Sequence, residues 1–219
     1  MTKEEYIQKM IKQEGWAPGW DAIDDAFDEL YPGEKEDHYM TTLISRALFG
    51  GPEYLDGYSA YKNPKGYYHI VTYGMSELYP DPDSFGNEYS KWGYEMTMKL
   101  KENTSSDCIW AMNMMGNLAR YTNQTGAYFK HGDFVIGDGT PIHIGIESMI
   151  TGLVIVNDTS AKTIDTIHGK VEFLQLVGIT TREVAAIRED TNNVDKLITL
   201  MKHDNPELIT DTKRDFSYL

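Results

Sequence analysis

Cysteine is nearly absent from this 219-residue chain, which carries Cys108 alone. One cysteine excludes an intrachain disulfide and a cysteine-ligated metal cluster. Long apolar runs are missing too: the longest, Leu153–Val156, is far shorter than the roughly 20 residues that span a bilayer. The first ten residues lack the apolar core of a signal peptide. These absences predict a cytoplasmic protein that does not cross a membrane.

Positive charge is also scarce, because 20 lysines and arginines stand against 34 aspartates and glutamates, for a net charge of −14. A chain of this sign repels phosphates, so nucleic acid is not an expected partner, whereas a basic protein would be attracted. The alternative is that the acidic residues only keep the protein soluble. Hydrophobic residues make up 41% of the chain, enough for a folded core.

The usual catalytic and cofactor motifs do not occur. The sequence holds no HExxH, no GxSxG and no glycine-rich nucleotide loop, and no two of its six histidines have helical ligand spacing. We therefore expect no cofactor and no bound metal. The role of one stretch, "HIVTYGMSELY" at 69–79, remains open. It is a catalytic elbow at Ser76, a ligand pocket, or a corner of the fold.

The pattern of apolar residues predicts helices and strands in alternating blocks. Residues 20–30 have the spacing of an amphipathic helix, and two strands flank the turn at 63–66. "YEMTMKLK" at 94–101 alternates, which predicts a strand with Tyr94 and every second residue in the core. The odd-numbered residues, from Glu95 to Lys101, are then expected in water.

The rest of the chain repeats this alternation. Residues 107–121 predict a broad, deeply packed helix, and 152–158 and 170–180 predict strands. Thr180 and Glu183 have capping-box spacing at the start of a further helix, and Asn193 is expected to cap the last one. The order predicts an α+β fold, with a mixed, largely antiparallel sheet packed with helices in one domain over 1–219.

Two histidines and an aspartate are candidates for chemistry. His131 and Asp133, in "HGD", form a conceivable acid–base pair of a hydrolase. The favoured interpretation is ordinary turn chemistry, since Gly-Asp precedes a predicted strand. His69 is expected to be a hydrogen-bonded histidine of the sheet. The fifteen tyrosines fit a recognition surface or plain packing equally well.

Several segments together resemble one family. "LYPGE", "LFGGPEYLDGYSAY", "HIVTYGMSELY", "WGYEMTMKLK", "NLARY", "HGD", "VEFLQLVGIT" and "LITDTKRD" occur in this order over about 20–214. The combination and its spacing are similar to the Suppressor of fused family, and specifically to the N-terminal domain of its animal members.

The resemblance implies a binding protein with no enzymatic activity. Animal members sequester Gli transcription factors by clamping a short segment as an added strand between two domains. Carried onto this chain, the groove residues fall on Tyr121 and Asp133, while the groove's tryptophan falls on Leu48, where this sequence departs. These three are the expected partner-binding residues, in a groove without the second domain.

Short, single-domain members are typical of bacteria, where the resemblance implies an immunity protein that binds and neutralises a cognate toxin. A basic toxin domain would suit the acidic chain. A hydrolase using His131 and Asp133 and a self-associating scaffold are the alternatives.

Overall fold

The sheet and helices come from a computed structural model that describes residues 1–41 and 55–219. The helices are α1 (Lys3–Lys12), α2 (Pro18–Leu30), α4 (Ile109–Thr125, after the short 3₁₀ turn Ser105–Cys108), α5 (Thr181–Glu189) and α6 (Asn193–Asp204). The strands are β1 (Asp37–Met40), β2 (Gly57–Asn63), β3 (Tyr67–Tyr73), β4 (Tyr89–Leu100), β5 (Phe134–Ile136), β6 (Ile150–Asn157), β7 (Ile164–Thr166) and β8 (Gly169–Thr180).

The eight strands form one sheet in the order β1-β2-β3-β4-β8-β6-β5, with β7 also paired to β8. The β4–β8 pair is parallel and all other pairs are antiparallel. This confirms the predicted α+β fold with a mixed, largely antiparallel sheet. None of the helices in the described residues combines the length and apolarity that crossing a membrane requires.

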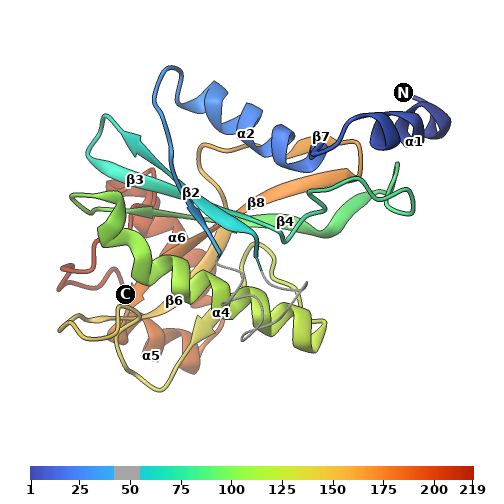
Figure 1. The fold of residues 1–219 in the computed structure, drawn as a ribbon. Coiled ribbons are helices and arrows are strands. Elements are labelled where there is room, and N and C mark those ends of the chain that lie inside the picture. The colour runs from blue at the N-terminus through green and yellow to red at the C-terminus, as the bar shows by residue number, and fades with distance from the viewer. Residues whose placement is uncertain (42–54) are drawn as a thin grey trace.

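Helices cover both faces of the sheet (Figure 1). Helix α4 lies on one face, where its Met112 and Met115 pack with the even-numbered core residues of β4 and β8. On the other face, α2 packs around Phe27 at one end, while α5 and α6 pack on β6 and β8 at the other. Because both faces are covered, residues of either parity along the central strands are buried.

The prediction that the odd-numbered residues of β4 face solvent is therefore wrong. Glu95, Thr97 and Lys99 are completely buried, and of the odd-numbered residues only Lys101 reaches solvent. Alternation along a strand separates its two faces, but it does not show whether a second layer covers the polar one.

Thr97 and Lys99 belong to a buried polar seam with Asp158 and Glu207, between the cluster around Phe27 of α2 and the cluster of α5 and α6. The Lys99 ammonium lies 3.4 Å from the Asp158 carboxylate and donates to Ser160 (2.7 Å) and Glu207 (3.2 Å). The second oxygen of Asp158 lies 2.9 Å from His69, which confirms His69 as a hydrogen-bonded histidine of the sheet. Each buried charged side chain of the seam therefore has a hydrogen-bonding or oppositely charged partner. An unpaired charge in the low-dielectric interior would be strongly destabilising.

The seam holds its carboxyl groups in the ionised form. Burial raises the pKa of Asp158, but the neighbouring His69 and Lys99 outweigh it and hold this pKa well below its usual range. Burial likewise raises the pKa of Glu207, yet hydrogen bonds and charge from Lys65 and Lys99 lower it to about 2.

The stretch 69–79 turns a corner of the fold around the Glu95 carboxylate. The backbone N–H groups of Gly74 (3.0 Å), Met75 (3.3 Å) and Ser76 (2.9 Å) donate to it, as do the hydroxyls of Ser76 and Thr72, each at 2.6 Å. Gly74 has φ +126°, a conformation that glycine adopts most readily. Ser76 is buried and donates its own proton to Glu95, so the stretch is an architectural corner.

We predict that Glu95→Gln destabilises the fold by about 3 kcal/mol or more, because an amide NH₂ would face the donors that the carboxylate now satisfies. Chemical denaturation measures this. The control is Glu88→Gln, an exposed side chain just before β4, which should change the free energy of unfolding by less than ~0.5 kcal/mol. Equal effects of the two variants would contradict the role given to Glu95.

A second prediction concerns acid stability. Because the folded pKa of Glu207 lies below its ordinary value of 4.5, its contribution is present above that value and lost as the pH falls towards 2. Lys99→Met should cost about 3 kcal/mol or more at neutral pH and partly flatten this acid limb, since one of the two lysines that lower the pKa of Glu207 is gone.

The control for Lys99 is Lys101→Met on the same strand, whose ammonium is exposed and pairs with Asp211 at 2.7 Å. It should cost less than about 1 kcal/mol. Denaturant titrations from pH 7 to pH 2 compare the variants. An acid limb of unchanged slope in Lys99→Met would refute the coupling.

Candidate partner-binding site

The site begins at a wide bulge in β4. Tyr89 pairs with Lys170 of β8 and Tyr94 pairs with Glu172, so five steps along β4 match two along β8. Within the bulge Lys91 and Gly93 have positive φ values of 52° and 80°. Such bulges often redirect side chains next to functional sites.

The bulge is fastened to the corner at 74–76. The Lys91 ammonium donates to the Gly74 carbonyl (2.7 Å), and the Trp92 N–H donates to the Met75 carbonyl (3.1 Å). The Trp92 indole N–H donates to the Asn123 side chain of α4 (2.9 Å). The bulge is therefore attached to the corner and to α4, and the Trp92 ring is held by its own hydrogen bond.

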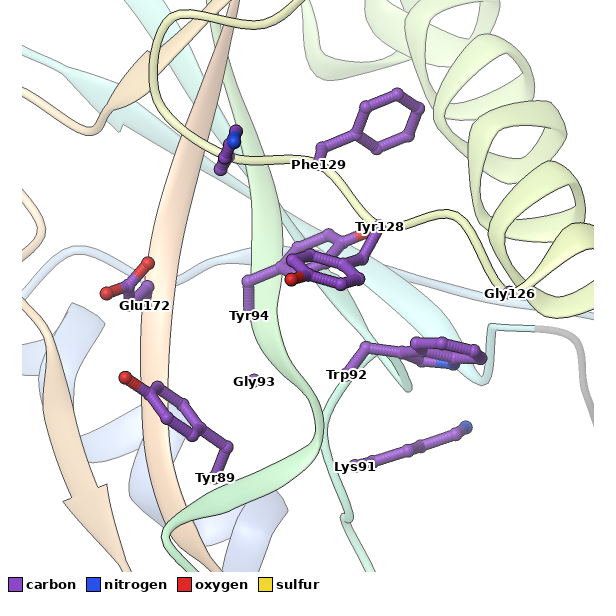
Figure 2. A pocket seen from close by; sticks show the side chains of 10 residues that line it. Tyr89, Lys91, Trp92, Gly93, Tyr94, Gly126, Tyr128, Phe129 and Glu172 are labelled. Carbon is purple, nitrogen blue, oxygen red and sulfur yellow. The ribbon is translucent and has the colours of Figure 1, made fainter.

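A cavity of about 520 Å³ lies between the bulge, β8 and the segment after α4 (Figure 2). Helix α4 ends at Gly126, which takes the left-handed conformation (φ 75°) as its C-cap. The chain then passes along the cavity through residues 128–130. The walls are mostly aromatic: Tyr89, Trp92, Tyr94, Tyr128 and Phe129, joined by Lys91, Lys130 and Glu172.

Tyr121 and Asp133, two of the three expected binding residues, lie beside this cavity without lining it. The Tyr121 side chain is 50% exposed, and its ring lies 6.2 Å from the ring of Phe129. The Asp133 carboxylate accepts the backbone N–H of Lys130 at 2.9 Å. Each thus contacts a wall residue of the cavity. Leu48, the third, lies outside the described residues.

Asp133 also immediately precedes β5, the strand at the end of the sheet. The Ile155 N–H donates to its carbonyl at 2.8 Å, and among the residues that the structure describes β5 pairs with β6 alone. In an antiparallel ladder bonded positions alternate, so the N–H groups of Phe134 and Ile136 point to the outer edge. Phe134 is 37% exposed at this edge.

His131 and Asp133 do not form an acid–base pair. His131 Nδ1 accepts the backbone N–H of Asn157 at 3.0 Å, and Asp133 holds the turn at Lys130. The turn interpretation of Asp133 is confirmed. In the described parts of the chain, no three histidine, cysteine, aspartate or glutamate side chains are placed to hold a metal ion.

The tyrosines divide between packing and surface. Eight of those that the structure describes are buried in the core: Tyr6, Tyr31, Tyr58, Tyr61, Tyr67, Tyr68, Tyr73 and Tyr94. Tyr89 and Tyr128 are 46% and 64% exposed at the cavity. Trp92, Tyr128 and Glu172 also line the cavity, and the sequence did not predict them as binding residues. The available signal was Gly93 inside a strand pattern, which indicates a bulge.

Comparison with known proteins places this fold in a family. The sequence model of the Suppressor of fused protein matches residues 51–215, three quarters of the chain. The chain belongs to the Suppressor of fused family. The human and mouse Suppressor of fused homologues are each 32% identical to it over 200 residues. The match covers 84% of this chain and 41% of each relative, so the chain spans about two fifths of their length.

Solved Suppressor of fused structures share the fold. A crystal structure of the Sufu–Fu complex has a TM-score of 0.77 at 24% identity, covering 92% of this chain and 93% of that one. Drosophila Suppressor of Fused also reaches 0.77, at 25% identity, over 92% of this chain and 51% of that one. A homologue from Neisseria gonorrhoeae reaches 0.62 at 14% identity, over 92% and 97%.

Proposed function

We propose that this chain is a protein-binding domain that binds and neutralises a cognate toxin, as a bacterial immunity-type protein of the Suppressor of fused family. The observation that carries the proposal is the outer edge of β5, with the exposed Phe134 ring on the α5–α6 face of the sheet and the exposed Tyr121 ring of α4 on the opposite face. We call these residues the β5 surface.

An open strand edge offers backbone donors and acceptors in a row, which an extended segment of a partner completes as an added strand. Exposed aromatic rings beside it supply apolar area and are typical anchors of protein interfaces. Further apolar side chains are exposed nearby in sequence, since Ile144 is 88% and Ile146 38% exposed. The β5 surface therefore combines backbone pairing with anchor contacts.

Charge indicates the kind of partner. The chain carries a net charge of −14, and acidic side chains follow the exposed side of α2 at Asp21, Asp25, Asp28 and Glu29. Such a surface attracts a basic protein and raises its association rate. A basic toxin domain fits this chemistry, and a second copy of this acidic chain does not.

The direct test is co-expression of the chain with the products of genes adjacent to its own. We expect one product to be toxic alone, to be tolerated with this chain, and to elute with it as a complex of defined stoichiometry in size-exclusion chromatography with light scattering. Survival without a complex, or no rescue by this chain, would contradict the proposal. Oligomers of the chain alone would support the scaffold instead.

We expect Tyr121→Ala to weaken the complex at least tenfold, because half of this ring is exposed at the β5 surface. The matched control is Tyr79→Ala, which removes a ring of similar exposure (48%) in the segment after β3. Isothermal titration calorimetry measures both, and denaturation checks that the variants are folded. A loss of affinity that is equal in both variants would argue against the β5 surface.

Salt dependence tests the charge argument. Raising the salt from about 0.05 M to 0.5 M shortens the screening length severalfold, so the association rate should fall several-fold while dissociation changes little. Stopped-flow fluorescence measures the two rates. An association rate independent of salt would show that charge does not steer this partner.

A further inference from the structure

We propose that the aromatic cavity beside β4 receives an arginine side chain of the partner, held by ring faces and by the Glu172 carboxylate. The inference rests on the proposed protein-binding function and names what one part of the surface recognises. It uses the cavity, the surrounding rings and one carboxylate, none of which forms the β5 edge.

Glu172 occupies an unusual place in the sheet. It precedes Leu174 and Leu176 on the α4 face of β8, whose side chains are buried in the α4 cluster. Helix α4 has ended at this level, so the carboxylate is half-buried at the cavity instead of beneath the helix (Figure 2). None of the described residues forms a hydrogen bond or ion pair with it. It is an acceptor without a partner among the described residues, in a cavity that aromatic rings also line.

The rings suit a flat cation. Tyr89 and Tyr94 come from the two ends of the bulge, with Trp92 between them, and Tyr128 lies across from the bulge (Figure 2). Guanidinium groups stack on such rings and pair with carboxylates through two parallel hydrogen bonds. A cavity of about 520 Å³ lies within the size range of sites that bind small molecules, so it has room for this side chain.

The bulge keeps these rings apart and in place. A Cβ at Gly93 would come within 3.0 Å of the Tyr89 ring, and a Cβ at Gly169 would come within 2.7 Å of the Tyr89 backbone. Tyr89 therefore packs against two positions that have no side chain. Its ring lies against Gly93 and its backbone against Gly169, so a side chain at either glycine would displace this part of the wall.

Two lysines, Lys91 and Lys130, also line the cavity and would favour an anionic ligand. Their positions decide whether the cavity favours an anion or a cation. The Lys91 ammonium is occupied by the Gly74 carbonyl at 2.7 Å. Lys130 is exposed, so its charge is hydrated and interacts weakly with ligands. Glu172 is less exposed, and the chain as a whole is acidic. The cavity therefore favours a cation, with Lys130 as a weak internal competitor.

The test needs no partner. The 219-residue chain is titrated with N-acetyl-arginine amide while NMR follows the Trp92 indole N–H and the Gly93 and Gly126 amides. N-acetyl-norleucine amide serves as the uncharged probe and O-phosphotyrosine as the anionic one. We expect saturable shifts with the arginine probe at a concentration at least tenfold lower than with either other probe.

Variants identify the groups responsible. Glu172→Gln should weaken arginine binding at least tenfold, Lys130→Met should tighten it several-fold, and Glu88→Gln outside the cavity should leave it unchanged. Norleucine binding as tightly as arginine, stronger shifts with phosphotyrosine, or no saturable shift would each overturn the proposal. Because these probes are small molecules and no protein partner is present, such a failure would not affect the Tyr121→Ala test of the β5 surface.

Discussion

The Glu95 carboxylate is the acceptor on which the corner at 74–76 and the β4 bulge depend. Five donated hydrogen bonds fix the corner at 74–76 around it. Lys91 and Trp92 then attach the β4 bulge to the carbonyls of that corner. Burial raises the pKa of Glu95, and the hydrogen bonds from Ser76 and Thr72 oppose that rise. The corner would lose its backbone partners if this acceptor were removed.

A bulge fixed in this way opens the sheet where a helix no longer covers it. Helix α4 covers the even-numbered side of β4 and β8 as far as Gly126, and beyond it the strands carry Tyr89, Trp92 and Glu172 without a helical layer. The cavity is thus a consequence of layer lengths: the strands extend past the helix that covers them. On the opposite face the seam around Lys99 joins two helical clusters, so polar groups are buried there with partners.

The β5 surface and the cavity lie next to each other through two contacts. The Tyr121 ring meets Phe129, and Asp133 holds the backbone of Lys130. Both Phe129 and Lys130 line the cavity. The segment 128–133 therefore connects the wall of the cavity to the start of β5, so the two proposed contacts share one stretch of backbone.

The sequence by itself determined most local structure and the family. The capping box of Thr180 and Glu183, the turn at Asp133 and the strands at 94–101 and 170–180 all follow from spacing that acts over a few residues. One local prediction was wrong: α6 starts with Asn192 as its N-cap, and the Asn193 side chain donates to the Ala186 carbonyl instead.

Only the tertiary structure decided which polar residues are buried and where the cavity lies. Glu95 and Lys99 alternate with apolar residues as surface residues do, and the second helical layer that covers them comes from distant parts of the chain. The cavity joins residues 89–94, 126–130 and 172, which no local pattern connects. Periodicity reports the faces of one element, whereas burial depends on what packs against each face.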